Sequence, residues 1–589
     1  MRARAAIVFL ANLSPLHLSS KHNSQAFSQK LERNEFILLV IIMASCARRR
    51  LTASDVAAIM ADSGTDVSDT DDGQTGPNAT DSSESPSSSE DESFEEAGRE
   101  EMLTGRDGTK WRRMTRSHYV GRTAAHNVFT ANPGISPSCR NQAARSEYQA
   151  WKLFINECIL RKILQHTLEE GRRSNTEFLL DLCELEAFIS LTYLRGIYGR
   201  NHPLDFLFNR YYGPSVFHKT MARDRYKEIL RFLRFDDKTS RRARSVDKFA
   251  PIREVFDLFA ENCRTSYIPE YSLTLDEQVL PLKTRCGFIV FMPNKPDKYG
   301  LKFWLLCKVN SKYVVNIIPY LGAQEKATRG DLSLAEDVIS RIAQSVTGKG
   351  YNITMDNFFT SLRAAVKLKE KRTTVVGTIR KNRKELSNHM VLIKKNATFS
   401  SDFYYHEDSG TAFVNYQCKK GKNVCLLSTM HSSPTTDTST EKKKPEIVLS
   451  YNKGKVGVDC FDMMSKQLST HSPCFRWPVA VWNNILDIAE INAWIIFRKA
   501  TGQAISRRQF ILNLCQQLSE DYCQKRERLR PRPTIDIPEN IVPQRRQCQA
   551  TRQCKNMTVT VCKACFRPTC GSCTKPEANR ITITTCQNC

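Results

Sequence analysis

The sequence predicts a mixed α/β core that is set between helical segments and followed by a small cysteine-rich module. Three observations support this fold class. Amphipathic patterns with helical spacing fill residues 145–265 and 476–500, alternating and β-branched runs with two helices between them fill 271–380, and Cys-x-x-Cys pairs gather after residue 546. At 589 residues the chain is far longer than one core normally serves, so several domains are expected.

The N-terminal segment, residues 1–108, is predicted to be disordered. Between Ala61 and Glu101 there are fourteen acidic residues against one basic residue, with hardly any large apolar side chain. Such a segment buries too little apolar surface to offset the entropy lost on ordering. Because the sequence after Met43 reads like a natural protein start, we interpret residues 1–42 as an upstream extension or an artefact of the gene prediction.

The whole chain has a net charge of +25, and because the acidic segment from Ala61 to Glu101 carries −13, the remainder carries about +38 and is strongly basic. This charge favours a polyanionic partner, with nucleic acid as the default, and a basic protein without such a partner is the alternative. No apolar run approaches the roughly 18–20 residues that cross a membrane, and Phe36–Met43 is too short. We expect a nucleic-acid partner and no membrane.

Residues 109–265 are predicted to form helices. Apolar side chains recur at helical spacing in SEYQAWKLFINECILRKILQHTLEE, DLCELEAFISLTYLRGIYG, MARDRYKEILRFLRF and FAPIREVFDLFAENC. The polar faces carry many arginines, which a solvated face explains as well as contact with DNA does. A second helical part, residues 469–530, centres on RWPVAVWNNILDIAEINAWIIFRKA, where Pro478 stands at a helix start.

Residues 266–380 change to a mixed pattern. The alternating LTLD is followed by KFWLLCKV and KYVVNIIPYLG, a helix at LSLAEDVISRIAQSV, the strand YNITMD, the helix FFTSLRAAVKLKEK and the strand TTVVGTIR. Asn310-Ser311 is the expected hairpin turn between the second and third strands. The order β-β-β-α-β-α-β predicts a mixed sheet with helices packed against it.

Residues 381–444 interrupt this pattern and are predicted to be an insertion domain. EIVLSY is then expected to resume a strand in the last part of the core, residues 445–468. A helix follows within YNKGKVGVDCFDMMSKQL, with Gly454 and Gly457 in the turn that leads into it. Asp459 would then lie in the first turn of that helix.

Three aspartates mark a candidate catalytic site: Asp276 in the opening strand, Asp356 at the end of the central strand and Asp459 in the later helix. Acids on neighbouring strands about 4.8 Å apart can converge, and clustered carboxylates repel unless cations lie between them. Such oxygen ligands suit Mg²⁺ or Mn²⁺. Two such ions can activate a water or 3′-hydroxyl and can stabilise the leaving oxygen of a phosphodiester. The alternatives are structural: an edge acid paired to a base for Asp276, and helix capping for Asp459.

The phrases LTLDEQ, MPNKPDKYGLK, NITMDNFFTS, VVGTIRKNRKEL, VGVDCFDMM and RWPVAVWNNILDIAEINAWIIF resemble, in this order, the piggyBac transposase family from about residue 145 to the C-terminus. The resemblance implies an RNase H-like catalytic core carrying the triad Asp276, Asp356 and Asp459, with Asp462 as an accessory acid. It also implies cut-and-paste transposition into TTAA sites through hairpinned ends by a dimer. The two helical parts would form the dimerisation and DNA-binding domain, and a nuclear location is expected.

The same resemblance points to contacts with double-stranded DNA. Arg380 and Arg383, in TIRKNRKEL, match basic positions used near the active site, and Arg476 of RWP is predicted to bind DNA as well. The preceding segment THSPCF departs from the family, which often carries a basic cluster there, and hydroxyl and thiol groups cannot make the phosphate contacts of Lys or Arg. KRERLRPR, which leads into the basic linker 531–545, is a nuclear address, a phosphate patch or a solvated linker.

Residues 546–589 hold eight cysteines, including three Cys-x-x-Cys pairs, that can close two tetrahedral Zn²⁺ sites. The metal would drive folding of so small a module, and scattered free thiols are the alternative. The resemblance implies a zinc domain that recognises transposon ends. One ion would be bound by Cys548, Cys554, Cys570 and Cys573, and the other by Cys562, Cys565, Cys586 and Cys589. Cys548 is the least secure ligand because the first pair is Cys-x₅-Cys, and Cys573 stands where the family often has His.

Two other functions are open to the sequence. A domesticated nuclear protein that binds DNA or chromatin without cutting it would explain THSPCF and the altered first cysteine pair. Terminal inverted repeats beside the gene would favour the transposase instead. A RING-like ubiquitin-ligase module would explain the C-terminal cysteines but leaves the aspartates unexplained.

Overall fold

The computed structural model describes residues 102–115, 127–199, 201–293, 298–322, 330–393, 397–529, 545–551, 553–562 and 567–574. The predicted disorder up to residue 101 and the interpretation of residues 1–42 lie outside these ranges. The chain divides into two units, Met1–Tyr522 and Cys523–Cys589. Among the described helices, none combines the length and apolar character of a membrane span.

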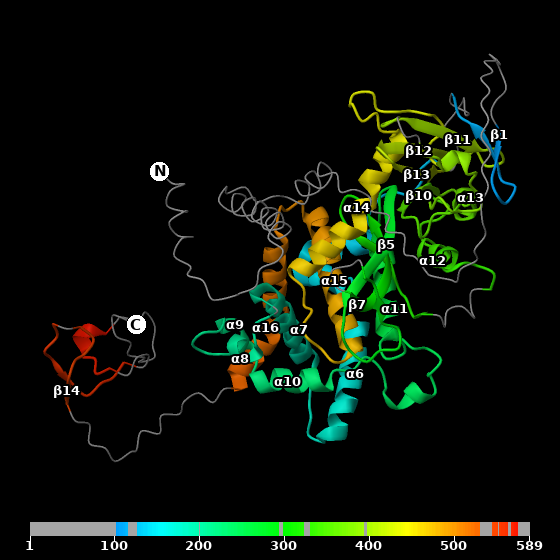
Figure 1. The fold of residues 1–589 in the computed structure, drawn as a ribbon. Helices are drawn as coiled ribbons and strands as arrows, with labels where there is room; N and C mark the ends of the chain where they lie inside the picture. The colour runs from blue at the N-terminus through cyan, green and yellow to red at the C-terminus, as the bar shows by residue number, and fades with distance from the viewer. Residues whose placement is uncertain are drawn as a thin grey trace, which may run out of the picture. The chain divides into compact units, whose positions relative to one another are not determined.

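One large mixed sheet organises the first unit (Figure 1). Its eleven strands lie in the order β1-β2-β11-β12-β13-β10-β9-β5-β7-β6, with β8 also paired to β7. They are β1 (Met102–Thr104), β2 (Lys110–Arg113), β5 (Ser272–Pro281), β6 (Val290–Phe291), β7 (Tyr299–Lys308), β8 (Val314–Pro319), β9 (Asn352–Met355), β10 (Thr374–Thr378), β11 (Ser401–His406), β12 (Ala412–Lys419) and β13 (Lys422–Ser428).

The predicted order of elements across 266–380 is confirmed, with the short β6 added. β5, β7 and β8 form the antiparallel part, and β9 and β10 continue the sheet in parallel with β5. Helices α12 (Leu334–Ile342) and α13 (Leu362–Glu370) connect these strands, and Ser333 and Glu336 form a capping box at the start of α12. The mixed α/β prediction therefore holds for this part of the chain.

The segment predicted as an insertion adds strands to the same sheet. β13 pairs antiparallel with β10, and β12, β11 and β2 follow outward, so the sheet continues past the parallel strands. β1 begins at Met102, inside the N-terminal segment that the sequence predicts to be disordered. Long-range pairing of this kind leaves no local mark in a sequence, because each strand shows only its own alternation.

Helix α14 (Glu446–Gln467) corrects the sequence prediction for residues 446–458. EIVLSY is the first part of this helix and not a strand, because Ile447, Val448 and Tyr451 lie on one helical face and pack against the β10, β12 and β13 side of the sheet. Gly454 and Gly457 lie inside the helix and not in a turn. Figure 1 shows α14 on one side of the strands and α12 and α13 on the other.

The helical stretches predicted within residues 109–265 and 469–530 are present, together with four described helices that the sequence did not single out, whereas Lys110–Arg113 and Gly134–Ile135 are strands. The helices of these two parts are α4 (Pro137–Arg145), α5 (Glu147–Lys152), α6 (Glu157–Ser174), α7 (Leu182–Tyr198), α8 (Leu204–Leu207), α9 (Ser215–Thr220), α10 (Arg223–Phe232), α11 (Arg253–Ser266), α15 (Trp477–Thr501) and α16 (Arg507–Leu529). The first predicted helix is broken after Lys152, and Asn156 caps α6 through the N–H of Ile159. A two-stranded sheet, β3 (Gly134–Ile135) with β4 (Tyr267–Ile268), joins this part to the core.

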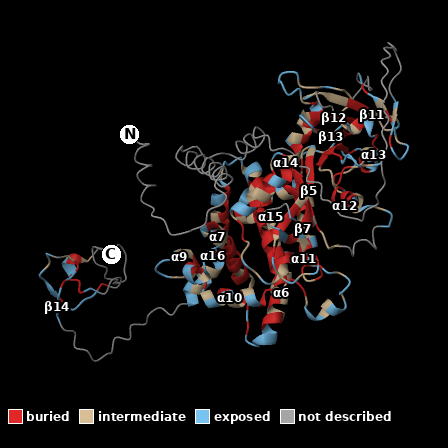
Figure 2. Ribbon diagram, in the orientation of Figure 1, coloured by how far each residue is buried: buried red, intermediate tan, exposed pale blue. Residues whose placement is uncertain are grey.

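Helix α15 is buried on nearly all sides, as Figure 2 shows. Its polar side chains are satisfied inside the protein. Asn492 accepts from the N–H of Val314 and donates to its carbonyl, both at 2.9 Å, which fixes α15 to β8. Glu490 pairs with Arg507 of α16 at 2.8 Å, and both side chains are almost fully buried.

The second unit is small. Its described residues include β14 (Arg546–Gln547), paired antiparallel with β15 (Met557–Thr558), and a 3₁₀ turn at Gly571–Cys573. Its described core consists mainly of cysteines.

Candidate active site

Two aspartates meet where β9 ends beside β5. The two strands are parallel, with Leu275 opposite Met355, so the next residues, Asp276 and Asp356, are neighbours across the sheet. Carboxylate oxygens of Asp276, Glu277 and Asp356 all lie within 4.8 Å of one another. Three acids from two strands thus form one compact group, the acidic cluster.

Glu277 is the member of the acidic cluster that the sequence analysis missed. Alternation directs it to the face of β5 opposite Asp276, and only the adjacent acids in LTLDEQ could have signalled it. β9 pairs with β5 only as far as Leu275, so no strand in the described part of the chain covers the edge of β5 at Glu277 on that side. The unpaired edge leaves room for the Glu277 carboxylate to approach Asp356.

Lys302, which packs against aromatic rings, forms an ion pair with Glu277. The Lys302 ammonium lies 3.5 Å from a Glu277 carboxylate oxygen, and both side chains are about 15% exposed. The same ammonium lies 4.0 Å from the ring centroid of Trp304, and Phe358 stacks on Trp304 at 5.3 Å. These contacts fix one acid of the cluster in position.

Burial and neighbouring charges shift the protonation of two cluster members, Asp276 and Asp356. Burial raises the pKa of Asp276 well above its usual range, and the charges of Glu277, Asp356 and Asp459 raise it further. Burial likewise raises the pKa of Asp356 to about 6. The N–H groups of Phe358 and Phe359 donate to Asp356 Oδ1 at 3.1 and 3.3 Å and oppose this rise. Two crowded carboxylates, Asp276 and Asp356, that resist ionisation fit a hard divalent cation, which would stabilise their charged forms.

The two glycines of α14 allow the helix to lie directly on β5 and β9. A methyl group at Gly454 would come within 2.1 Å of Thr354 Oγ1, and one at Gly457 within 2.5 Å of Thr274 Oγ1. Thr274 Oγ1 also donates to the Gly454 carbonyl at 2.5 Å. This close approach brings the next turn of α14, which carries Asp459, toward Asp276.

Asp459 and Asp462 lie in the interior of α14, so the capping alternative for Asp459 is excluded. Asp459 is exposed and lies outside the 4.8 Å group, although its charge raises the pKa of Asp276. Asp462 pairs with Lys466 at 2.8 Å and accepts from Gln278 Nε2 at 3.2 Å. The roles predicted for both acids stay predictions.

The three predicted DNA-binding arginines differ in setting. Arg380 is exposed, and its Nε donates at 3.3 Å to Asn357, the residue after Asp356. Arg383 donates to the Thr360 carbonyl at 3.2 Å. Arg476 is instead bound within the chain: its guanidinium donates to the Leu233 carbonyl at 3.0 Å, and to those of Leu230 and Arg231, at the end of α10. The structure thus gives Arg476 a capping role that the sequence did not suggest.

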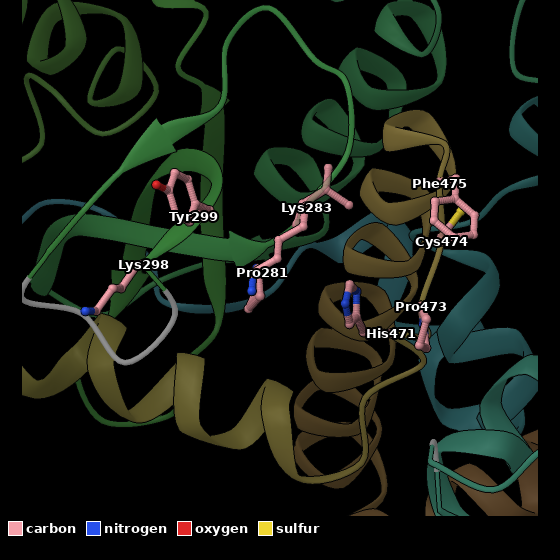
Figure 3. Close-up of a pocket in the computed structure, with 9 residues that line it drawn as sticks. Pro281, Lys283, Lys298, Tyr299, His471, Pro473, Cys474 and Phe475 are labelled. Carbon is pink, nitrogen blue, oxygen red and sulfur yellow. The ribbon is translucent and has the colours of Figure 1, made fainter.

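A cavity of about 500 Å³ opens between the ends of β5 and β7 and the segment that links α14 to α15 (Figure 3). Lys283 and Lys298 line it, together with Tyr299 and His471. Phe475 of THSPCF also lines the cavity and is 90% exposed. The Thr284 hydroxyl donates a hydrogen bond to the Phe475 carbonyl at 2.6 Å. Two lysines and exposed rings are the groups that bind phosphates and unstacked bases.

In the second unit four cysteines gather. Sulfur atoms of Cys548, Cys554, Cys570 and Cys573 all lie within 4.8 Å of one another, including Cys548, the least secure ligand by sequence. Asn556 donates to Cys570 at 3.4 Å, and this bond is the main reason that the pKa of Cys570 falls to about 6. Four thiols with one already favouring its thiolate form fit a zinc ion.

The other four predicted zinc ligands are less well placed by the structure. Cys562 is buried in the second unit, and Cys565, Cys586 and Cys589 lie outside the described residues. The second zinc site stays a prediction.

The family model described as transposase IS4 matches residues 146–494, which is more than half of the chain. The chain belongs to this family. Within it the chain is of the piggyBac type, as comparisons with solved structures and curated proteins show. A solved structure titled as a piggyBac transposase synaptic complex with hairpin DNA superposes with a TM-score of 0.65 and 28% identity, covering 78% of this chain and all of that one.

Two curated human proteins are similar to this piggyBac-type chain. PiggyBac transposable element-derived protein 3 (Homo sapiens) is 23% identical over 340 residues, covering 54% of this chain and 55% of that protein. The chimeric ERCC6-PGBD3 protein (Homo sapiens) is 23% identical over the same length, covering 31% of its own sequence. The aligned part of this chain thus spans about half of the length of the first relative and about a third of the length of the second.

Proposed function

We propose that this chain is a divalent-metal-dependent DNA transposase that cuts and joins strands at TTAA targets through an RNase H-like core. The observation that carries the proposal is the acidic cluster at adjacent strand ends, within the part of the chain that matches the transposase family. The strand order β8-β7-β5-β9-β10, with β9 and β10 parallel to β5, supports the RNase H-like assignment. Asp459 would complete the catalytic set from α14, with Asp462 as its accessory.

The acidic cluster would hold Mg²⁺ or Mn²⁺. When bound, two such ions activate a water or 3′-hydroxyl and stabilise the leaving oxygen of a phosphodiester. The protein's own contribution is to fix the ligands: the N–H groups of Phe358 and Phe359 orient Asp356, and Lys302 orients Glu277. Because Arg380 is exposed next to this site, it can receive a phosphate of the strand being cut.

Double-stranded DNA is the proposed partner, bound as transposon ends and TTAA target by a homodimer in the nucleus. The cavity of Figure 3 supports a path for the strand, because it begins where β5 ends, five residues or about 17 Å along the strand from Asp276. The four gathered cysteines would bind one structural Zn²⁺, and Cys562 with Cys565, Cys586 and Cys589 a second. The solved relative was determined with hairpin DNA, which supports hairpinned ends here.

The alternative is a domesticated protein that binds DNA or chromatin without cutting it. Two observations favour it: Asp459 lies outside the acidic cluster, and Arg476 is engaged within the chain. The first human relative is named as a transposable element-derived protein, and such a name fits a domesticated protein.

A plasmid excision assay separates the two functions. Cells would carry a donor flanked by the element's own ends, with wild type, Asp356→Asn or Asp224→Asn, an exposed acid of α10. Asparagine keeps the size of Asp356 but removes the charge that a cation needs, so excision should fall at least about 100-fold. Asp224→Asn should excise like wild type. A well-expressed, DNA-binding wild type that never excises would point to the domesticated protein.

A further inference from the structure

A second cavity, of about 390 Å³, lies between the β7–β8 hairpin and the C-terminal end of α15. Among the described residues, no carboxylate lines it, but four cationic side chains do: Lys308, Lys312, Arg498 and Lys499. None of them belongs to the acidic cluster or to the cavity of Figure 3. The question is what balances their charge.

Two of the four cations share one acid. Lys499 Nζ lies 3.1 Å from Glu270, and the Lys308 ammonium contacts the other oxygen of the same carboxylate. Both ammonium groups also donate to the Tyr267 hydroxyl, at 2.7 and 3.4 Å. The Glu270 carboxylate carries one negative charge, so it balances only one of the two ammonium groups. Lys308 is only 5% exposed, so its charge has little contact with water.

Lys312 is the cavity lysine whose buried charge no described carboxylate balances. It is 8% exposed, and its ammonium donates to the Val309 carbonyl. The described residues place no carboxylate at ion-pair distance from it, and burial lowers its pKa. Its φ of 65° belongs to the turn between β7 and β8, in which the Lys312 N–H donates to the Lys308 carbonyl at 3.0 Å. Burial without a carboxylate among the described residues is the feature of Lys312 that a bound anion would offset.

Arg498 adds a fourth charge at the mouth of the cavity. Its guanidinium lies 4.9 Å from the ring centroid of Trp494, and no described carboxylate pairs with it. Arg498 and Lys499 stand in the last turn of α15, where the helix dipole favours cations. That dipole accounts for these two side chains but not for the buried Lys312, which comes from the hairpin.

We infer that this cavity is a phosphate-binding site, formed to take a compact polyphosphate or a phosphodiester of a nucleic-acid strand. Four cations against the single carboxylate of Glu270 leave an excess of positive charge in a partly desolvated space. Arginine offers a planar fork to phosphate oxygens, and the buried lysines act as point charges. The inference goes beyond the proposed transposase activity and does not depend on it.

The test uses the full chain and inorganic tripolyphosphate, and follows the melting temperature as ligand is added. Two variants remove cavity charges, Lys312→Met and Arg498→Gln, and Arg172→Gln removes an exposed charge from α6 as a control. Each cavity variant should weaken tripolyphosphate binding about tenfold or more, whereas the control should bind like wild type. Without ligand, Lys312→Met should melt at or above the wild-type temperature, because an unbalanced buried charge is gone.

A second arm distinguishes the source of the phosphate. If tripolyphosphate shifts the wild type but not the cavity variants, the site takes free polyphosphate. If tripolyphosphate has no effect, but the cavity variants alone reduce the salt dependence of duplex DNA affinity by about one ion each, the site takes a strand phosphate. If both cavity variants match the control in both arms, the inference is overturned. If Lys312→Met fails to fold, Arg498→Gln alone tests the inference. Excision is not measured in either arm, so this test and the test of the transposase proposal can fail independently.

Discussion

The packing of α14 on the sheet can be tested by adding one methyl group at Gly457. An ideal Cβ there would lie 2.5 Å from Oγ1 of Thr274 and 3.0 Å from its Cβ, both inside normal contact distance. Alanine improves the helix propensity of α14 by about 1 kcal/mol. Overpacking costs about 1–3 kcal/mol, and a lifted helix also loses the hydrogen bond from Thr274 to Gly454, worth about 1 kcal/mol. The balance is a net destabilisation of about 1–3 kcal/mol.

Urea unfolding of the full chain, followed by tryptophan fluorescence, measures this loss. Gly457→Ala should also lower excision, because a lifted α14 carries Asp459 away from Asp276. Lys453→Ala, on the exposed side of the same helix, should stay within about 0.5 kcal/mol of wild type. Thr274→Ala removes the closest atom, so the double variant should lose less than the two single variants add up to. If Gly457→Ala is as stable as wild type, close approach is not what positions this helix.

Three further predictions concern other parts of the chain. Burial raises the pKa of Asp487 to about 7, so the folded state binds its proton more tightly than the unfolded state, whose carboxyl titrates near 4. Stability should therefore fall by about 3 kcal/mol between pH 4 and pH 7, and Asp487→Asn should flatten this slope in pH-dependent urea melts; an unchanged slope would contradict the assignment. Arg476→Ala should destabilise the chain by about 1–3 kcal/mol through the uncapped α10 while leaving the salt dependence of DNA affinity unchanged, and a reduced salt slope would restore its predicted DNA role. Removal of metal with a chelator, or Cys573→Ser, should unfold the second unit but not the first, as nuclear magnetic resonance of the full chain would show, with Cys158→Ser, an exposed thiol of the first unit, as the neutral control.

Local patterns in the sequence were enough to find part of the candidate site. Alternation in LTLD and the run YNITMD place Asp276 and Asp356 on strands, and the structure sets those strands side by side. The cysteine spacing predicts metal sites in the second unit, and the family resemblance implies the group of four sulfurs that this unit assembles. The two aspartates could be placed because each depends on the period within one short segment.

Other features of the site depend on which segments meet. Gly454 and Gly457 are compatible with a turn and with a helix pressed on a sheet, and only the contacts with Thr354 and Thr274 decide between them. Arg476 has the same charge whether it binds DNA or caps α10, and its contacts with helix carbonyls decide its setting here. Neither choice leaves a periodic trace in the sequence.

By itself, the sequence determined the helical parts, the strand and helix order of residues 266–380, the family resemblance and the position of two of the acids. Only the tertiary structure decided that α14 is one continuous helix, that residues 401–428 extend the same sheet, and that Glu277 completes the acidic cluster while Asp459 stands outside it. The physical reason is that periodicity reports which face of an element is buried, but not the element that buries it. Strand pairing and the ends of neighbouring strands are set by contacts between residues far apart in the chain.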